Sequence, residues 1–201
     1  MKQGALLCLL VLALLLSGCG AEVAPTQVPS VAPSGSSLVL SSDAFAPDEL
    51  IPDRYSCFGQ NVSPPLSWEG VPEGAQSLAL LVDDPDSRPA GFVHWVIYNV
   101  PPSAAGLPEG VPGGGRLEDG TLQGRNDFAS YGSEAFPGGA EIKRVGYDGP
   151  CPPGEHRYVF RLYALDTVLD LAAEATLDQV LVAMEGHVLA QAELMGRFAP
   201  P

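Results

Sequence analysis

The stretch Leu78–Val100 constrains the fold more than any other part of the chain. An apolar run, Leu78–Val82, leads into an acidic loop that contains Asp84 and Asp86. A second run, rich in β-branched and aromatic residues, then carries His94. Apolar runs bounded by turn residues are typical of buried strands, and this loop is too short for a helical crossover. We therefore expect neighbouring antiparallel strands that bring the aspartates close to His94; the alternative is a solvated turn beside a core histidine.

A second informative stretch is Tyr147–Leu165, in which a loop rich in proline and glycine leads directly into another strand. Because side chains alternate along a strand, His156, Tyr158 and Phe160 should share one face. The prolines remove backbone freedom and suit the wall of a binding site. The alternative is a simple turn followed by a core tyrosine.

The N-terminus has the pattern of a secretory signal, predicted over residues 1–18. The apolar run Leu6–Leu16 is too short to span a bilayer comfortably, and the small residues after it precede Cys19. This ending resembles the lipobox of bacterial lipoproteins, in which the cysteine is lipidated. We expect Cys19 to carry acyl chains that anchor the protein in the bacterial cell envelope, in the outer membrane if the organism has one. The alternative is an ordinary signal peptide with a chance cysteine.

Residues 19–37 mix proline, serine, alanine and valine without periodicity and are predicted to be a disordered tether. Residues 38–201 then form one domain of sufficient length for a sizeable core. The chain contains 23 glycines and 20 prolines, which recur between short apolar runs. This distribution favours a mainly β domain over a helical bundle.

The formal net charge of −14 limits the partners of the protein. Such an acidic chain is repelled by nucleic acid and by anionic lipid surfaces. We therefore expect no nucleic-acid partner, and membrane association only through the N-terminal anchor.

The cysteines predict a disulfide. Of the four, Cys8 lies in the predicted signal and Cys19 is assigned to the lipid, which leaves Cys57 and Cys151. An exported domain with one such pair is expected to form a disulfide. The alternative is a Cys151 nucleophile working with His156, which would need a free thiolate.

The C-terminal stretch Thr176–Phe198 is predicted to be a helix that packs on the sheet. Thr176 and Gln179 form a capping-box pattern, and apolar residues recur at helical spacing after them. Leu169–Ala173 is expected to add a shorter helical turn. We assign His187 a structural or surface role.

Several motifs together resemble the phosphatidylethanolamine-binding protein family, in its bacterial Raf-kinase-inhibitor-like branch. They are NVSPPLSW, DDPDS followed by HWVIYNV, GRNDF, YDGPCPPGEHRYVF and ALD, which span most of the region after residue 38. The resemblance implies a β-sandwich with Greek-key character and a few peripheral helices, including a C-terminal one. It also implies a small anion-binding pocket lined by Asp84, Asp86, His94, His156 and Tyr158. Residues 129–144 depart from the family pattern because this segment is longer and more polar than expected.

Two imidazoles, a phenol and adjacent carboxylates suit a phosphate or a phosphoethanolamine-like headgroup. We expect binding to strengthen as the histidines protonate, with no cofactor or metal and no enzymatic turnover. One alternative is phosphoester hydrolysis or metal catalysis by the same residues, although no GxSxG, P-loop or HExxH motif is present. Another is an envelope inhibitor or interaction module that acts on a protease or kinase.

Overall fold

A computed structural model describes residues 38–87, 89, 91–131, 135–136 and 138–201. The predicted signal, the tether and Cys19 lie outside the described residues. The elements in chain order are β1 (Val39–Ser41), η1 (Asp53–Tyr55, a 3₁₀ helix), β2 (Leu66–Glu69), β3 (Ser77–Asp84), β4 (Phe92–Val100), β5 (Gly106–Leu107), β6 (Leu122–Gln123), η2 (Asp127–Ser130, also 3₁₀), β7 (His156–Leu165), α1 (Leu177–Met184) and β8 (Val188–Phe198). None of the described helices is long and apolar enough to cross a membrane.

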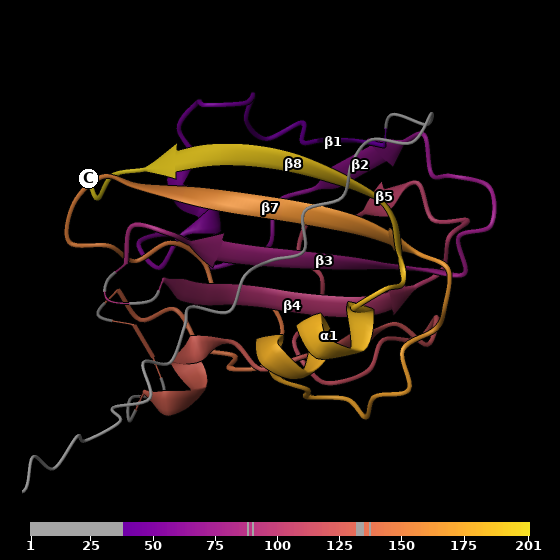
Figure 1. Ribbon diagram of the computed structural model, residues 1–201. Coiled ribbons are helices and arrows are strands. Elements are labelled where there is room, and N and C mark those ends of the chain that lie inside the picture. Colours follow the sequence, from indigo (N-terminus) through magenta and orange to yellow (C-terminus); the bar gives the residue numbers. More distant parts are fainter. Residues whose placement is uncertain (1–37, 88, 90, 132–134, 137) are drawn as a thin grey trace, which may run out of the picture.

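The strands form two antiparallel sheets, so the prediction of a mainly β sandwich is confirmed. The small sheet has the order β1-β2-β5 and lies behind the large sheet, whose order is β6-β4-β3-β7-β8 (Figure 1). Strands β3 and β4 are direct neighbours, with Val82 opposite Trp95, as the short acidic loop predicted. On its other edge β3 pairs with β7, which places the two most informative stretches of the sequence side by side.

Both faces of the large sheet are covered, which explains the continuous apolar run in β3. One face packs against the small sheet through side chains such as Leu80, Phe160 and Trp68. The other packs against α1, where Leu81 and Met184 belong to a second cluster (Figure 1). A strand buried on both faces has no polar side to alternate with.

The predicted C-terminal helix is wrong beyond its first two turns. Thr176 caps α1 through the expected capping box, but the helix ends at Met184. Gly186, with φ of +78°, then lies in the turn that leads into β8. Strand β8 pairs with β7 along its whole length, and its buried residues alternate with exposed ones. The period-two pattern of small residues in this strand competed with the helical spacing of the larger ones, and sheet pairing decided the outcome.

The expected helical turn at Leu169–Ala173 is also absent from the structure, in which residues 169–172 are irregular and only a simple turn follows. The amide of Asn99 accepts from the Leu169 N–H at 2.9 Å and donates to the Leu169 carbonyl at 2.9 Å. These two bonds satisfy backbone groups that a helix would otherwise pair internally.

Candidate functional site

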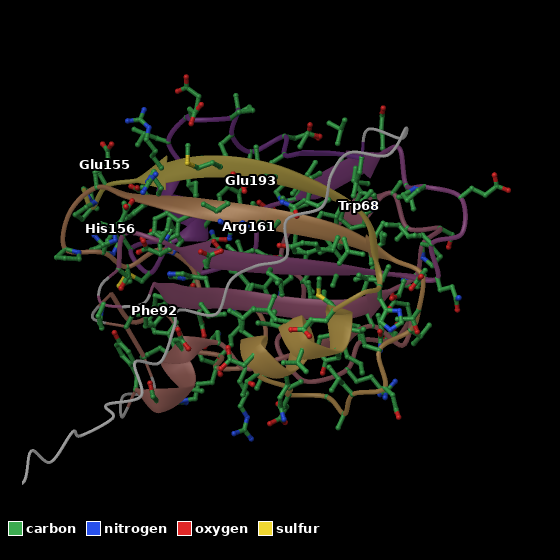
Figure 2. The ribbon with its side chains drawn as sticks, in the orientation of Figure 1. Trp68, Phe92, Glu155, His156, Arg161 and Glu193 are labelled. Atoms are coloured by element: carbon green, nitrogen blue, oxygen red, sulfur yellow. A yellow bond between two sulfur atoms is a disulfide. The ribbon has the colours of Figure 1, made fainter. Side chains whose placement is uncertain are left out.

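Three strands of the large sheet contribute residues to one end of that sheet. Asp84 is the last residue of β3 and lies opposite Phe92, the first residue of β4. His156 is the first residue of β7, which runs antiparallel to β3. Figure 2 shows Phe92 and His156 at this same end. The antiparallel pairing thus gathers residues that are far apart in the sequence.

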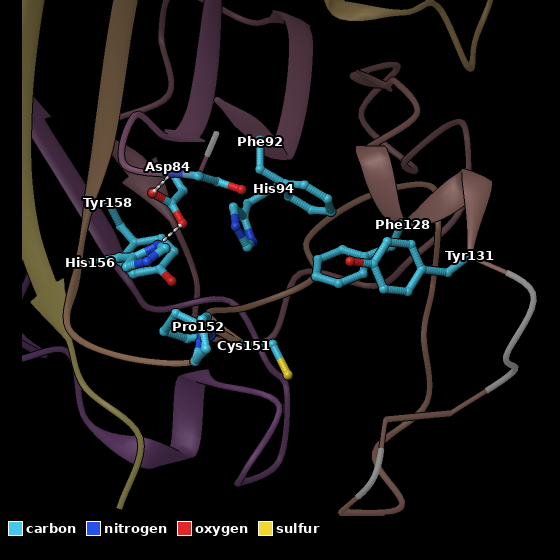
Figure 3. A pocket seen from close by; sticks show the side chains of 11 residues that line it. Asp84, Phe92, His94, Phe128, Tyr131, Cys151, Pro152, His156 and Tyr158 are labelled. Atoms are coloured by element: carbon cyan, nitrogen blue, oxygen red, sulfur yellow. Dashed lines mark hydrogen bonds and ion pairs between the residues drawn. The ribbon is translucent and has the colours of Figure 1, made fainter. Parts of the chain in front are cut away.

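A cavity of about 130 Å³ lies at this end of the sheet. Its lining consists of Asp84, Ser87, Phe92, His94, Phe128, Tyr131, Cys151, Pro152, Pro153, His156 and Tyr158 (Figure 3). The size suits a small oxyanion or headgroup, because drug-sized ligands occupy pockets of roughly 300 Å³ or more. Four of the five residues predicted for the site therefore surround one cavity, and the predicted proline-rich wall does so too.

Asp84 orients both the acidic loop and His156. Its Oδ1 accepts hydrogen bonds from the backbone N–H groups of Asp86 at 2.8 Å and of Ser87 at 3.1 Å. Its Oδ2 lies 2.7 Å from Nδ1 of His156. A carboxylate accepts, so Nδ1 carries a proton and donates it to this bond. The other nitrogen of His156, Nε2, is left for a ligand in the cavity (Figure 3).

His94 is almost completely buried and is held in one tautomer. Its Nδ1 lies 2.7 Å from the backbone carbonyl oxygen of Asp148. A carbonyl can only accept, so Nδ1 again carries the proton. Burial lowers the pKa of His94, against the hydrogen bond to Asp148 and the nearby carboxylate of Asp84, which both raise it. The neutral ring therefore presents the lone pair of Nε2 rather than a second N–H.

Tyr158 contributes a buried hydroxyl group that lies beside the Asp84 carboxylate without forming an ordinary hydrogen bond to it. Its side chain is 1% exposed, and its ring packs edge-on against His94 at 5.1 Å between centroids. No described residue forms a hydrogen bond with its hydroxyl group. Burial, together with the negative charge of Asp84, raises the pKa of Tyr158, so this hydroxyl keeps its proton. Thr121 and Tyr163 also have buried hydroxyl groups without a partner, but of these three residues Tyr158 is the one that lines the cavity.

The structure does not place Asp86 in the lining of the cavity. Its carboxylate instead forms two bonds to the guanidinium group of Arg157, at 2.7 and 3.0 Å, and accepts from the Arg157 backbone N–H at 2.9 Å. These bonds lower the pKa of Asp86 well below its usual range. Asp86 thus fixes the acidic loop to the start of β7, beside the site.

Asp148, which the sequence did not single out, joins the loops behind the cavity. Its side chain is fully buried. Oδ1 accepts from the Asn61 amide at 2.8 Å and from the Lys143 N–H at 3.0 Å. Oδ2 accepts from the Asn126 amide at 2.9 Å and from the Arg144 N–H at 2.9 Å. Three of the motifs noted above, NVSPPLSW, GRNDF and YDGPCPPGEHRYVF, therefore meet at this carboxylate.

The predicted disulfide between Cys57 and Cys151 is present, with 5.3 Å between the Cα atoms. It rules out a free Cys151 nucleophile in this structure and places Cys151 in the cavity wall. The described part of the 129–144 segment packs beside the bridge, because Phe136 joins Phe128 and Cys57 in one apolar cluster.

Aromatic side chains form the wall of the cavity opposite Tyr158 (Figure 3). Phe128 packs against Phe92 at 4.7 Å and against Tyr131 at 5.1 Å between ring centroids. Phe128 belongs to the GRNDF motif, so the resemblance offered a signal for it. Tyr131 lies in the segment that departs from the family pattern, and nothing in the sequence marked it as a wall residue.

The cavity offers hydrogen-bonding groups of both kinds to a ligand. The Tyr158 hydroxyl donates, the Nε2 atom of neutral His94 accepts, and Asp84 contributes negative charge beside them. Among the described residues, no three His, Cys, Asp or Glu side chains are grouped as metal ligands would be. The donor and the acceptor together suit a small polar molecule held by hydrogen bonds.

Comparison with known proteins identifies the family of this chain. Residues 41–199 match the family described as phosphatidylethanolamine-binding protein. The chain belongs to this family. A UPF0098 protein from Methanothermobacter thermautotrophicus is 53% identical over 160 residues, which cover 79% of this chain and 97% of the relative. A UPF0098 protein from Chlamydia muridarum is 42% identical over 165 residues, which cover 79% of this chain and 97% of the relative.

Solved structures of this family have the same fold. A putative phosphatidylethanolamine-binding protein homologue from Chlamydia trachomatis superposes with a TM-score of 0.70 and 38% identity, covering 83% of this chain and all of that chain. Escherichia coli YbcL, described as a new member of the mammalian family, gives a TM-score of 0.69 and 29% identity. The superposition covers 82% of this chain and 99% of YbcL. The resemblance found in the sequence is therefore confirmed at the level of family and fold.

Proposed function

We propose that the protein binds a small anionic or phosphorylated ligand, such as phosphate or a phosphoethanolamine-like headgroup, in this cavity. The observation that carries the proposal is the buried hydroxyl group of Tyr158, which has no ordinary hydrogen bond and which a ligand oxygen would satisfy. A buried donor without a partner is unfavourable by about 1 to 3 kcal/mol, so a ligand oxygen gains by pairing with it. The nearby imidazoles of His94 and His156 line the same cavity and can form further hydrogen bonds with a ligand.

Binding without turnover is the activity that we propose. The one cysteine in the described cavity wall is held in the disulfide. Covalent catalysis needs an activated nucleophile within reach of a base, and an oxidised Cys151 cannot serve as that nucleophile. The apolar wall of Phe92, Phe128 and Tyr131 would cover the less polar part of a bound headgroup.

Calorimetric titration of the full chain tests this proposal. Phosphate and phosphoethanolamine would be titrated at pH 6 and pH 8 into the unaltered protein and a variant with both His94→Ala and His156→Ala. We expect saturable binding that is tighter at pH 6 and lost in the variant. His187→Ala, outside the cavity, is the matched control and should bind as the unaltered protein does. A folded protein that gives no binding heat with either ligand would reject the proposal.

We also propose that the protein is held in the bacterial cell envelope by acyl chains on Cys19. The support is the sequence pattern of a short apolar run, small residues and this cysteine, followed by the tether. Expression in a bacterial host with labelled palmitate should label the unaltered chain but not the Cys19→Ser variant. Labelling of both chains would place the lipid elsewhere, and labelling of neither would argue against the anchor.

A further inference from the structure

The hydrogen-bonding pattern of the cavity specifies the ligand more closely than its charge does. The Tyr158 hydroxyl lies beside the Asp84 carboxylate without an ordinary hydrogen bond to it, so it can donate to a ligand oxygen. His94 is different, since its single proton is committed to the Asp148 carbonyl through Nδ1. His94 lines the cavity, and its Nε2 accepts while the ring is neutral. A fully matched ligand must therefore both accept and donate.

The surroundings of His94 keep its ring neutral near pH 7. Three carboxylates face it, those of Asp84 at the end of β3, Asp127 at the start of η2 and Asp148 before β7. All three raise its pKa, but burial outweighs them and the pKa of His94 lies below the ordinary value of 6.5. The groups packed on the ring itself are the uncharged aromatic side chains of Phe92, Phe128 and Tyr158.

We infer that the cavity takes an oxyanion that carries its own acidic proton, such as inorganic phosphate or a protonated phosphomonoester, in preference to sulfate or a phosphodiester. The proton of the P–OH group is donated to Nε2 of His94, while an unprotonated oxygen accepts from Tyr158. For a given phosphomonoester, Asp84 favours the protonated form, because its carboxylate repels the additional negative charge of the fully deprotonated form. This inference rests on the proposed function and adds the protonation state of the ligand to it.

A comparison of sulfate with phosphate separates this inference from the proposed function, because the two ions share shape and size but differ in the protons that they carry. At pH 8 hydrogen phosphate keeps one proton, whereas sulfate has none. An acceptor left unmatched in a buried site weakens binding about tenfold or more. We therefore expect phosphate to bind the full chain at least tenfold more tightly than sulfate in calorimetric titrations at pH 8. Equal affinities would overturn the inference and leave the proposed function intact, and binding of neither ion would overturn both.

A second pair of probes varies the proton within one molecule. Methyl phosphate loses its second proton near pH 6, as phosphomonoesters do, whereas dimethyl phosphate has no such proton at any pH used. Methyl phosphate should bind at least tenfold more tightly than dimethyl phosphate at pH 5.5, and the advantage should shrink at pH 8. An advantage that is the same at both pH values would contradict the inference.

Two variants assign the preference to His94. His94→Ala removes the lone pair and puts no other acceptor in its place, and we expect it to reduce the preference for phosphate over sulfate at least threefold. Tyr158→Phe keeps the acceptor and loses the donor, so both ions should weaken by similar factors and the preference should survive. A preference that disappears in Tyr158→Phe would contradict the assignment to His94, even if His94→Ala fails to fold. His187→Ala is the matched surface control and should bind both ions unchanged.

Discussion

Replacing Asp148 by asparagine should destabilise the protein more than any other isosteric change near the site. The buried carboxylate accepts four hydrogen bonds, two from backbone N–H groups and two from the amides of Asn61 and Asn126. An asparagine has one oxygen and one NH₂ group. Whichever way the new amide turns, two of the four donors face another donor.

The magnitude follows from these four bonds. A hydrogen bond to a charged group contributes about 1.5 to 3 kcal/mol, so losing two removes about 3 to 6 kcal/mol. Relief of the burial of a charge offsets part of this loss. We expect Asp148→Asn to lower the free energy of unfolding by about 3 to 5 kcal/mol, a large share of the roughly 5 to 15 kcal/mol that stabilises a typical domain.

Urea denaturation followed by tryptophan fluorescence measures this loss, since Trp68 and Trp95 are both in the core. Asp170→Asn is the matched control, because Asp170 is exposed and the change should stay within about 0.5 kcal/mol. A loss below about 1 kcal/mol in Asp148→Asn would show that the loops behind the cavity do not depend on this carboxylate. Phosphate binding to the variant should also weaken, because the Asp148 backbone orients His94.

Three further changes test other parts of the structure. Replacing both disulfide cysteines by serine should lower the free energy of unfolding in urea by about 2 to 4 kcal/mol; unchanged stability would refute a stabilising role. Gly149→Ala should destabilise by about 1 to 3 kcal/mol because its Cβ would overlap the Tyr55 carbonyl oxygen, whereas Gly154→Ala, with no atom within 4 Å, should be neutral. Because burial lowers the pKa of His94, the unfolded chain binds a proton that the folded one does not below about pH 6.5. Stability should therefore fall from pH 7 to pH 5, and less steeply in His94→Gln.

The parts of the fold that could be predicted are those in which a local pattern and the tertiary environment agree. The apolar run of β3 is continuous because both of its faces are buried, and the short acidic loop permits only a neighbouring strand. The disulfide followed from the number of available cysteines. In the C-terminal stretch the two disagree, since helical spacing and strand alternation overlap in β8 and pairing with β7 decides between them.

The residues of the site could likewise be predicted only where a local sequence pattern agrees with the tertiary environment. Asp84 and His94 could be placed together because strand geometry relates them, whereas His156 joined them only through the family resemblance. Asp86 is adjacent in sequence to the cavity residues, yet its partner Arg157 holds it outside the lining, and no local pattern predicted that ion pair. Asp148 was not predicted because no local pattern separates a buried aspartate from an exposed one. Its role depends on donors from loops that meet only in three dimensions.

The pairing of β3 with β7 has a consequence for biosynthesis. The Ser77 hydroxyl donates to the carbonyl of Thr167, 90 residues further along the chain, and Asp84 reaches His156 across 72 residues. Because the ribosome synthesises the chain from its N-terminus, the central sheet and the cavity cannot be completed until nearly all of the chain has been made. Such long-range pairing is typical of domains that fold slowly. Nascent or truncated chains that end before β7 should leave β3 without its partner, available to proteases and to aggregation.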